Sequence, residues 1–482
     1  MEGNLRSKVV GSFFWVFIDS SVQRVLQFII GIILARILLP EEFGLLGMIV
    51  VFIKFSELFI DSGFSFALIR KEKVARIEYE TVFWFNTCIS ILFFILLWFS
   101  SPFIADFFNK PILTGIVRAV SFGLLINATG SIQNIRLRRD LKFKELAITG
   151  ISSKLISGIT AIFLAINGFG VWALVFQQLL NNFLRVGFMF FFNRLLPRLK
   201  FSLRSFKELF SFSSKLLYGG IVSSVVSNIY PIIIGKFFSA SDVGFFDKAK
   251  TIQGAPVQFF TGIVQQVTLP TFAKIQNEND RFRNAYRNVI KISFFAIILP
   301  LALIVISAKP LIVVLLTDKW LPAAEILQII ALGGMFYPLS ALNVNIIGLK
   351  GRSDLVMYLQ FSKDALTILG VLVGIWFGIR GLVISYTITC IFAYLLNALF
   401  SNKVIDYPFY DQLYDILPFV LLALVTMLLA GLAGFLVDNL LIKLIIIWST
   451  GLIVYFLLAY ILNFKVLDEL KKILFELLSR IK

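Results

Sequence analysis

The stretch "IIGIILARILLPEEFGLLG", residues 29–47, decides the fold because it recurs as "IYPIIIGKFFSASDVGFFD", residues 229–247. In both, an apolar run ends near a base, passes through a short connection that carries an acid, and resumes at a glycine. A later pair of segments, 151–158 and 360–367, aligns at a similar offset. We interpret the chain as two homologous copies. The matched pairs are Arg36 with Lys236, Glu42 with Asp242, Gly44 with Gly244, and Lys154 with Lys363.

The composition places both copies in a membrane. Of the 482 residues 59% are hydrophobic, and the mean hydropathy is +0.90. Apolar runs of about 20 residues, long enough to cross a bilayer core of about 30 Å, recur from end to end. The sequence predicts an all-α polytopic membrane protein with fourteen spans, at 12–38, 43–69, 81–104, 112–134, 146–166, 169–192, 209–236, 244–272, 288–307, 322–348, 355–377, 380–401, 416–437 and 441–463.

The repeat divides these spans into lobes. We expect an N-lobe at 1–200, a C-lobe at 201–405, two further spans at 406–463 and a cytoplasmic amphipathic tail at 464–482. Six spans per copy is an even number, so both copies start on the same side of the membrane. Substrate sites in proteins with such parallel repeats lie between the repeats, and transport proceeds by rocking one against the other.

The net charge of +17 comes mainly from the connections between spans. With a cytoplasmic N-terminus, 29 of the 45 Lys and Arg fall in cytoplasmic segments and six in outer connections. This asymmetry follows the positive-inside rule and predicts that both termini are cytoplasmic. Because the bases are spread over loops rather than gathered on one face, we do not expect nucleic acid as a partner.

The residue inventory removes most enzyme classes. The chain has no histidine, which excludes Ser-His triads, His-ligated zinc and histidine proton relays. Cys88 and Cys390 both fall in apolar runs, where packing is a better reading than a disulfide or a metal site. We expect no enzymatic activity, no catalytic residues, no metal and no cofactor beyond a coupling H⁺ or Na⁺.

Polar side chains gather on single faces of several spans. At 100° per residue, a polar arc on span one includes Asp19, Gln23, Arg24 and Gln27. Span two carries Lys54, Glu57 and Asp61 on one face, and span eight carries Gln258 and Gln265, with Lys250 at the edge. A charge that faces lipid at mid-bilayer costs roughly 2.5–3.5 kcal/mol. These groups therefore line a water-filled cavity or pair with one another.

Two readings of the buried charges stay open. In the first they are structural ion pairs, such as Lys54 with Glu57 or Asp61. In the second they form one cavity with surplus positive charge, which suits an anionic cargo such as a phosphate. We favour the cavity because bases outnumber acids within the spans. The bases assigned to it are Arg24, Lys54, Lys154, Lys215, Lys250 and Lys363; its polar lining is Gln23, Gln27, Gln258 and Gln265; and the candidates for ion coupling are Asp19, Glu57 and Asp61.

Several longer blocks carry a family resemblance. "LPEEFGLLGM", "DSGFSFALIRKE", "GFGVWALVFQQL", "GKFFSASDVGFFDKAK", "DKWLPAAEILQI" and "YPLSALNVNIIGLKGRSDL" resemble the polysaccharide-export branch of the multidrug/oligosaccharidyl-lipid/polysaccharide exporter superfamily. Colanic acid exporters, teichuronic acid exporters and O-antigen flippases are similar in pattern. The resemblance runs from about Arg6 to Asp411 and covers both lobes.

The resemblance implies a flippase of lipopolysaccharide or related cell-surface polysaccharide biosynthesis. Such proteins move an undecaprenyl-pyrophosphate-linked oligosaccharide across the bacterial cytoplasmic (inner) membrane, and their fold is two six-helix lobes in a V around a cationic cavity, plus two extra helices. Membrane lipids, and polysaccharide polymerase or assembly proteins, are the further partners expected, and the protein is expected to be a monomer. Related flippases use bases in their first, second and eighth helices, where Arg24, Lys54 and Lys250 lie here.

Two other functions fit the sequence less well. A drug or metabolite antiporter of the same superfamily is the alternative, but a cationic drug would favour surplus acids in the cavity. A membrane polysaccharide polymerase or ligase needs catalytic groups on a sizeable outer loop, and the outer connections here are short. The net charge of the cavity distinguishes the flippase from the antiporter.

Overall fold

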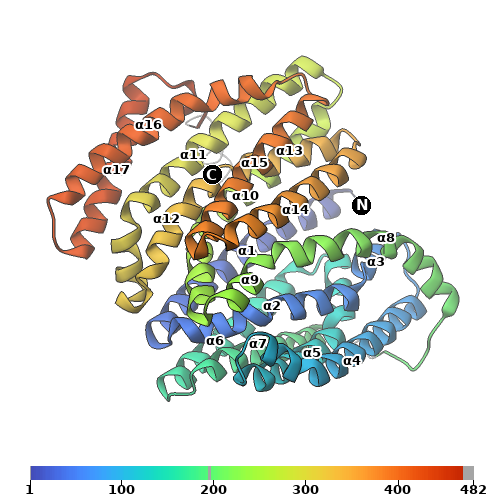
Figure 1. The fold of residues 1–482 in the computed structure, drawn as a ribbon. Coiled ribbons are helices and arrows are strands. Elements are labelled where there is room, and N and C mark those ends of the chain that lie inside the picture. The colour runs from blue at the N-terminus through green and yellow to red at the C-terminus, as the bar shows by residue number, and fades with distance from the viewer. Residues whose placement is uncertain (1, 194–196, 471–482) are drawn as a thin grey trace. The chain divides into compact units, whose positions relative to one another are not determined.

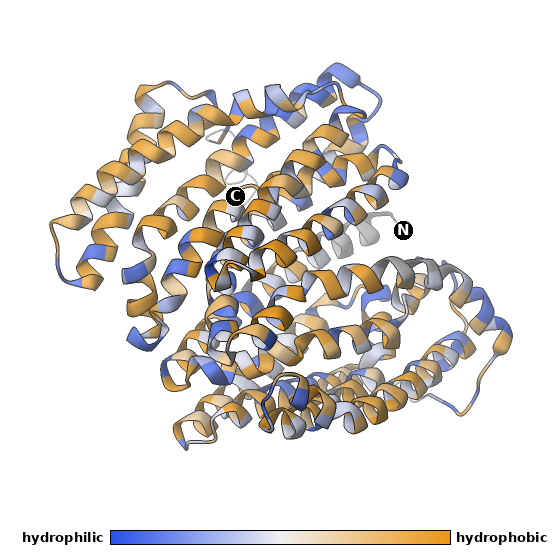
Figure 2. Ribbon diagram, in the orientation of Figure 1, coloured by the Kyte–Doolittle hydropathy of each residue, from blue (hydrophilic) through white to orange (hydrophobic). Residues whose placement is uncertain are grey.

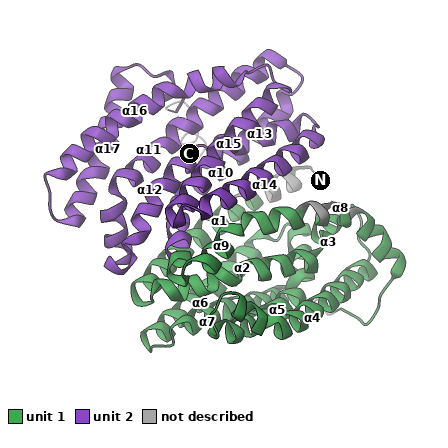
Figure 3. Ribbon diagram, viewed as in Figure 1, with its two compact units in different colours: residues 1–244 green, residues 245–482 purple. Residues whose placement is uncertain are grey.

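The chain is all-helical in its described part. The computed structural model describes residues 2–193 and 197–470, and these divide into two compact units, 1–244 and 245–482 (Figures 1 and 3). The lobe limits predicted from the repeat stay predictions, since the structure does not test them. Each unit is described below by itself.

The described residues of unit 1 form nine helices and the beginning of a tenth. They are α1 (Glu2–Ile37), α2 (Pro40–Asp61), α3 (Phe64–Arg70), α4 (Arg76–Phe107), α5 (Ile112–Arg139), α6 (Phe143–Ile166), α7 (Val171–Phe192), α8 (Leu203–Ser227), α9 (Ile229–Phe237) and the start of α10 (Ala240–Ile275). Within this unit α4 packs on α5, α6 on both α1 and α7, and α5 on α7, while α2 contacts α4, α5, α7, α8 and α9. Helix α2 is therefore central to unit 1.

Unit 2 holds the rest of α10, then α11 (Asn279–Leu316), a short 3₁₀ turn (Asp318–Trp320), α12 (Pro322–Gly334), α13 (Tyr337–Leu349), α14 (Ser353–Ile375), α15 (Gly378–Asn402), α16 (Phe409–Phe435) and α17 (Leu440–Ile461). The core follows α11, whose buried apolar residues pack against α12, α13, α16 and α17. Two polar anchors fix α17 on α11: the Tyr455 hydroxyl donates to the Phe295 carbonyl at 2.9 Å, and the Trp448 indole donates to Ser307 Oγ at 3.1 Å.

The lengths and hydropathy of most helices are those of membrane-spanning segments. Eleven are long and apolar enough to cross one, or up to twelve if the bent pair Gly220–Ser227 and Ile229–Phe237 forms one span, counted over the described residues. Figure 2 shows hydrophobic residues along most of their length, with hydrophilic residues concentrated at the ends and connections. The protein is therefore a multi-pass membrane protein.

The number of spans differs from the sequence prediction of fourteen. The two predicted spans outside the count are α7 and α10, which both carry polar faces. Helix α7 includes Gln178, Asn182 and Arg185, and α10 includes Asp247, Lys248 and Lys250. Length and hydropathy alone therefore do not support spans there. The amphipathic tail predicted at 464–482 lies outside the described residues from 471 onward.

The repeat motif forms a close backbone crossing inside unit 1. A Cβ on Gly44 would overlap the carbonyl oxygen of Ala240, and a Cβ on Gly244 would overlap that of Pro40. These four positions match at the offset of 200 seen in the sequence, so the contact is reciprocal. Only glycine, which lacks a Cβ, lets the starts of α2 and α10 approach this closely.

The same motif caps both helices. The Leu39 backbone N–H donates to Glu42 Oε2 at 2.7 Å, and the Ser239 backbone N–H donates to Asp242 Oδ2 at 3.2 Å. A carboxylate three residues after the cap satisfies a free N–H of the first turn and favours the positive end of the helix dipole. The acids matched by the repeat are thus explained by helix capping.

Candidate functional site

Unit 1 contains a polar cavity with a volume of about 690 Å³. Its walls come from α2, α3, α5 and α7. The polar side chains that line it are Lys54, Glu57, Asp61, Ser65, Asn127, Ser131, Asn134, Arg138, Gln178, Asn182 and Arg185. Such a group of charges and amides among membrane-spanning helices marks a candidate site for a polar ligand.

The wall formed by α2 carries three residues predicted from the sequence. Lys54 Nζ lies 2.7 Å from Glu57 Oε2, and the Ser65 hydroxyl donates to Asp61. The structure therefore brings Lys54, Glu57 and Asp61 to one cavity, as their helical spacing predicts. The pairing of Lys54 with Glu57 also bears out the ion-pair reading for that lysine, because one base is neutralised by one acid.

The walls formed by α5 and α7 supply residues that were not assigned to the site. Arg138 lies in the last turn of α5, where its Nε donates to Asn134 Oδ1 at 2.7 Å. On α7, Gln178, Asn182 and Arg185 recur at i, i+4 and i+7, so they share one helical face. That spacing is visible in the sequence. Arg138 lies outside the predicted span at 112–134, so the sequence places it in a cytoplasmic connection.

The cavity carries one more base than acids. Lys54, Arg138 and Arg185 face it, against Glu57 and Asp61. Within the described part of the chain, no carboxylate forms an ion pair with Arg138 or Arg185. A guanidinium offers five N–H donors in a planar fork that matches a phosphate or a carboxylate. The end of the cavity at Arg138 and Arg185 is therefore suited to an anion.

A second polar cluster joins α1 and α6. Gln23 Nε2 donates to Asp19 Oδ1 at 2.5 Å, and Lys154 Nζ donates to Gln27 Oε1 at 3.1 Å and to the Gln23 carbonyl at 3.4 Å. A Cβ on Gly150 would overlap Gln23, so the glycine lets the two helices approach. Four of the residues predicted for the site are thus brought together here, and the charge of Asp19 acts on both Lys154 and Arg185.

The other predicted residues are not part of these two groups, and four of them belong to unit 2. Arg24 is exposed on α1. Lys250 lies over the rings of Phe246 and Tyr386, at 5.8 and 5.7 Å from their centroids. Lys363 neighbours Asp364, whose Oδ1 accepts from Gln360 at 2.9 Å. Gln258 and Gln265 are on α10, and the side chain of Lys215 lies outside the described residues. The roles of all the predicted site residues stay predictions.

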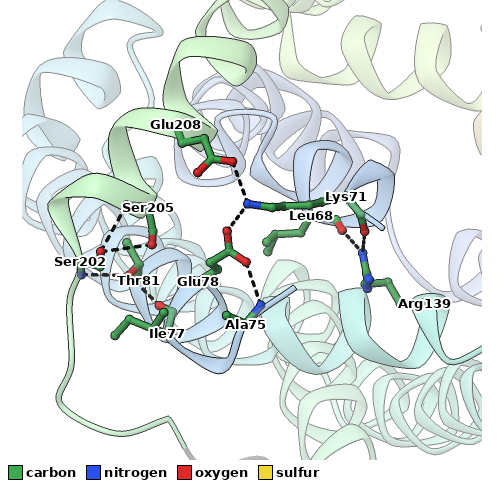
Figure 4. Close-up of polar contacts among 10 residues, drawn as sticks. All are labelled: Leu68, Lys71, Ala75, Ile77, Glu78, Thr81, Arg139, Ser202, Ser205 and Glu208. Atoms are coloured by element: carbon green, nitrogen blue, oxygen red, sulfur yellow. Dashed lines mark hydrogen bonds and ion pairs between the residues drawn. The ribbon is translucent and has the colours of Figure 1, made fainter. Parts of the chain in front are cut away.

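Helix α3, which forms part of the cavity wall, is only seven residues long and is held by Arg139 (Figure 4). The Arg139 guanidinium donates to the carbonyls of Leu68 and Lys71, the latter at 2.5 Å, and to that of Glu72 at 3.1 Å. These carbonyls at the end of α3 have no partner within the helix, so the arginine satisfies them. Arg139 thereby fixes Phe66 and Ile69, which line the cavity, against α5.

A lysine after α3 ties this wall to α4 and α8. Lys71 Nζ lies 2.6 Å from Glu78 Oε1 and 2.7 Å from Glu208 Oε1 (Figure 4). The hydrogen bond to Glu208 raises the pKa of Lys71 above its ordinary 10.5, and Glu78 adds to the effect. The same hydrogen bond lowers the pKa of Glu208 below its ordinary 4.5. The pair is therefore ionised over the whole neutral range.

Metal ligands do not gather in the described residues. Among the described residues, no three His, Cys, Asp or Glu side chains are placed so that they could hold a metal ion. The polar residues of the cavity are amides, hydroxyls, bases and two acids, of which Glu57 is paired with Lys54 and Asp61 accepts from Ser65. This inventory is suited to hydrogen bonding with a polar or anionic ligand.

Comparison with known proteins identifies the family. The family described as "Polysaccharide biosynthesis protein" matches residues 33–325. The chain is 28% identical over 347 residues to the teichuronic acid biosynthesis protein TuaB of Bacillus subtilis, covering 71% of this chain and 72% of that one. It is 23% identical to the lipopolysaccharide biosynthesis protein WzxC of Escherichia coli, covering 84% of this chain and 82% of that one.

Solved structures show the same fold at low sequence identity. The lipid II flippase MurJ, in an inward closed conformation, matches with a TM-score of 0.78 and 18% identity over 94% of this chain and 100% of that one. An inward-facing multidrug transporter of the MATE family, in the MOP superfamily, matches with a TM-score of 0.64 and 17% identity over 81% and 98% of the two chains. The resemblance read from the sequence motifs is thereby confirmed.

Proposed function

We propose, from the premise that this chain belongs to the polysaccharide biosynthesis protein family of membrane transport proteins, that it is a flippase for a lipid-linked oligosaccharide. The cargo proposed is an undecaprenyl-pyrophosphate-linked glycan that moves across the bacterial cytoplasmic membrane by alternating access. Fourteen spans in two lobes with two extra helices, and both termini in the cytoplasm, belong to the same proposal. No catalytic step is required, because the protein is a transporter rather than an enzyme.

The cavity of unit 1 is the observation that carries the proposal. It brings Arg138 and Arg185 together beside the candidate spans α2 and α5, and neither arginine forms an ion pair with a carboxylate among the described residues, so a ligand or water must meet these charges. Four amides, Asn127, Asn134, Gln178 and Asn182, add donors and acceptors of the kind that sugar hydroxyls require. The arginines are assigned to the anionic group of the cargo and the amides to its sugars.

The acids of unit 1 are assigned to coupling. Asp19, Glu57 and Asp61 lie on α1 and α2: Glu57 pairs with Lys54, the charge of Asp19 acts on Lys154 and Arg185, and Asp61 accepts from the Ser65 hydroxyl. When a cargo anion competes for Lys54, Glu57 loses its partner and becomes available to a proton or Na⁺. The other predicted bases, Arg24, Lys154, Lys215, Lys250 and Lys363, remain candidates for later contacts along the transport path.

A flipping assay tests the proposal. We expect the double variant Arg138→Ala/Arg185→Ala, reconstituted in proteoliposomes with a labelled lipid-linked oligosaccharide, to flip at least about tenfold more slowly, since each charged hydrogen bond contributes about 1.5–3 kcal/mol. The control is Arg281→Ala, which removes an exposed base paired with Glu278. A double variant that flips within about twofold of the wild-type rate, at equal incorporation, would reject the site.

The conservative variant Arg185→Lys separates charge from geometry. Lysine keeps the charge but lacks the planar fork, so partial activity is expected if Arg185 binds a phosphate through two hydrogen bonds. The alternative function, a drug or metabolite antiporter of the same superfamily, is favoured if cationic compounds rather than the lipid-linked glycan are transported. The surplus base in the cavity argues against that cargo.

A further inference from the structure

A second cavity in unit 1 has the opposite chemistry. It has a volume of about 660 Å³ and lies among α2, α4, α8 and α9. Val51, Leu97 and Ile104 are buried at its floor, whereas Phe103 is 74% exposed at its edge. We call this cavity the apolar groove; its walls include Phe52 and Phe55 of α2, Phe93 and Phe107 of α4, Val225 of α8 and Ile232 of α9.

The apolar groove offers nothing to a polar ligand. Its two hydroxyls belong to Ser56 and Ser100, and both donate to carbonyls of their own helix, to Phe52 at 2.8 Å and to Leu96 at 2.5 Å. Water needs two to four polar partners to remain in a cavity, and none is left here. Since α2 and α4 are long and apolar enough to span a membrane, the medium that meets the groove is lipid.

One end of the groove is marked by a base. Lys236, in the last turn of α9, donates from Nζ to the Phe107 carbonyl at 2.6 Å and lies 4.5 Å from the centroid of the Phe107 ring. Helix α4 ends at Phe107, so this is where a membrane-spanning helix reaches the headgroup layer. An ammonium has three donors, and two of those on Lys236 remain for another acceptor. The neighbouring Lys110 is already paired with Glu41, at 2.5 Å.

We propose that the apolar groove binds one anionic membrane phospholipid, with an acyl chain between α2, α4 and the α8–α9 pair and the headgroup phosphate at Lys236. Basic side chains at helix ends attract anionic headgroups, while the chain is held by apolar contact. This site is distinct from the polar cavity. Helix α2 presents Lys54 and Asp61 to the polar cavity and Phe52 and Phe55 to the groove.

The bound chain supports a bend. Helices α8 and α9 meet at an angle of 42° around Asn228, and the groove contacts Val225 before the bend and Ile232 after it. The side chain of Asn228 donates to the Ser224 carbonyl at 2.8 Å, satisfying an acceptor at the end of α8. A straight span would move one of the two apolar contacts away from the chain. The lipid therefore favours the bent form of this span.

Lipid retention measured by native mass spectrometry tests the site. The full-length protein is purified in detergent, stripped of lipid, and titrated with phosphatidylglycerol or phosphatidylcholine of the same acyl chains. Wild type is expected to retain one phosphatidylglycerol at roughly tenfold lower lipid concentration than phosphatidylcholine, which corresponds to about one anionic contact. Lys236→Gln is expected to remove this preference and leave the retention of phosphatidylcholine unchanged.

Filling the groove tests the chain site separately. Ser100→Trp, or Leu96→Trp should the first variant not fold, is expected to reduce retention of both lipids about tenfold. The matched control is Ile159→Trp, which adds the same side chain to an apolar face of α6 that is 66% exposed. Unchanged retention in the groove variants, or an equal loss in the control, overturns the proposal. Retention of undecaprenyl phosphate in place of phosphatidylglycerol would overturn it as well, by assigning the groove to the tail of the cargo.

Discussion

The two units treat buried charge in different ways. In unit 2, the side chain of Asp415 is 4% exposed. It forms ion pairs with Arg287 and, at 3.1 Å, with Lys291, and it accepts a hydrogen bond from the Tyr407 hydroxyl at 2.7 Å. In unit 1, Arg138 and Arg185 line an open cavity, and no carboxylate among the described residues lies within ion-pair distance of either. The first arrangement is complete without a ligand and the second is not. Charge inside a membrane protein therefore indicates a site only where the protein itself leaves it uncompensated.

The polar network of unit 2 extends beyond Asp415. The Tyr286 hydroxyl donates to Asn343 Oδ1 at 2.7 Å, and the Ser401 hydroxyl donates to the same oxygen at 2.5 Å. Asn343 in turn donates to the Leu339 carbonyl at 3.0 Å. Because α11, α13 and α15 are joined by groups that satisfy one another, we interpret this network as structural. Four predictions test the contrast, from the largest expected effect to the smallest.

Asp415→Ala is expected to be the most damaging change. It leaves Arg287 and Lys291 without a carboxylate and Tyr407 without an acceptor. Each hydrogen bond to a charged group contributes about 1.5–3 kcal/mol, and the variant loses the bonds of three residues to one carboxylate, so the yield of folded protein and its melting temperature in detergent should fall sharply. Glu325→Gln, which breaks the exposed pair with Arg380, serves as the control. Near-equal stability of the two variants would mean that Asp415 is not structural.

Gly130→Ala is expected to reduce transport while the fold is kept. Gly130 lines the polar cavity, and a Cβ there would lie 2.6 Å from Cγ2 of Val186 on α7. The overlap must be relieved by a shift of α7 or of Val186, at a cost of about 1–3 kcal/mol. Displacement of the cavity wall should lower the flipping rate, which is the quantity to measure. Gly187→Ala is the matched control because nothing lies within 4 Å of its added Cβ, and equal rates for both variants would contradict the role of the wall.

Glu57→Gln is expected to change stability little. Its partner Lys54 has a side chain that is 57% exposed, and pairs of this kind contribute about 0–1 kcal/mol. Transport should respond more than stability, because the variant removes an acid and leaves the cavity with two surplus bases. Melting temperature and flipping rate measured on the same preparation separate the two effects. A large loss of stability would place Lys54–Glu57 with the structural pairs of unit 2.

Glu208→Gln is expected to have the smallest effect, and one that depends on pH. The lowered pKa of Glu208 gives stability that is present above its ordinary pKa of 4.5 and is lost as the pH falls through the lower, folded value. The raised pKa of Lys71 gives stability that is present below 10.5 and is lost as the pH rises through the higher, folded value. The melting temperatures of variant and wild type should therefore differ slightly across the neutral range and converge as the pH falls below 4.5 and through the lower, folded pKa of Glu208.

The control for this pH profile is Glu278→Gln, which breaks an exposed pair between positions three apart on the chain. Glu278 pairs with Arg281 rather than with Lys71, so its replacement should leave the pair of Lys71 with Glu208 intact and keep the contribution of that pair to the pH profile. A difference for Glu208→Gln that persists unchanged at acid pH, where the carboxyl of Glu208 is protonated in the folded protein, would show that the side chain acts through packing rather than charge.

The sequence predicted those parts of the molecule that depend on local spacing. Lys54, Glu57 and Asp61 share a helical face by their positions alone, and the structure places all three on one cavity. Arg138 was missed because helix ends depend on capping and tertiary contacts, and α5 continues to Arg139. The partners of Lys71 are 7 and 137 residues away, so no local pattern indicates the longer contact. The spacing of residues along a helix shows which side chains share a face, whereas only the packing of the helices shows which face lines a cavity.

The reciprocal crossing at Gly44 and Gly244 constrains how the sequence can change. Each glycine makes room for a carbonyl of the other matched segment, so a side chain added at either position would displace the backbone of the other segment. Duplicated segments ordinarily drift apart because each can compensate for the other. Here neither position has that freedom. Among related sequences, both sites should remain glycine even where the surrounding copies have lost all recognisable similarity.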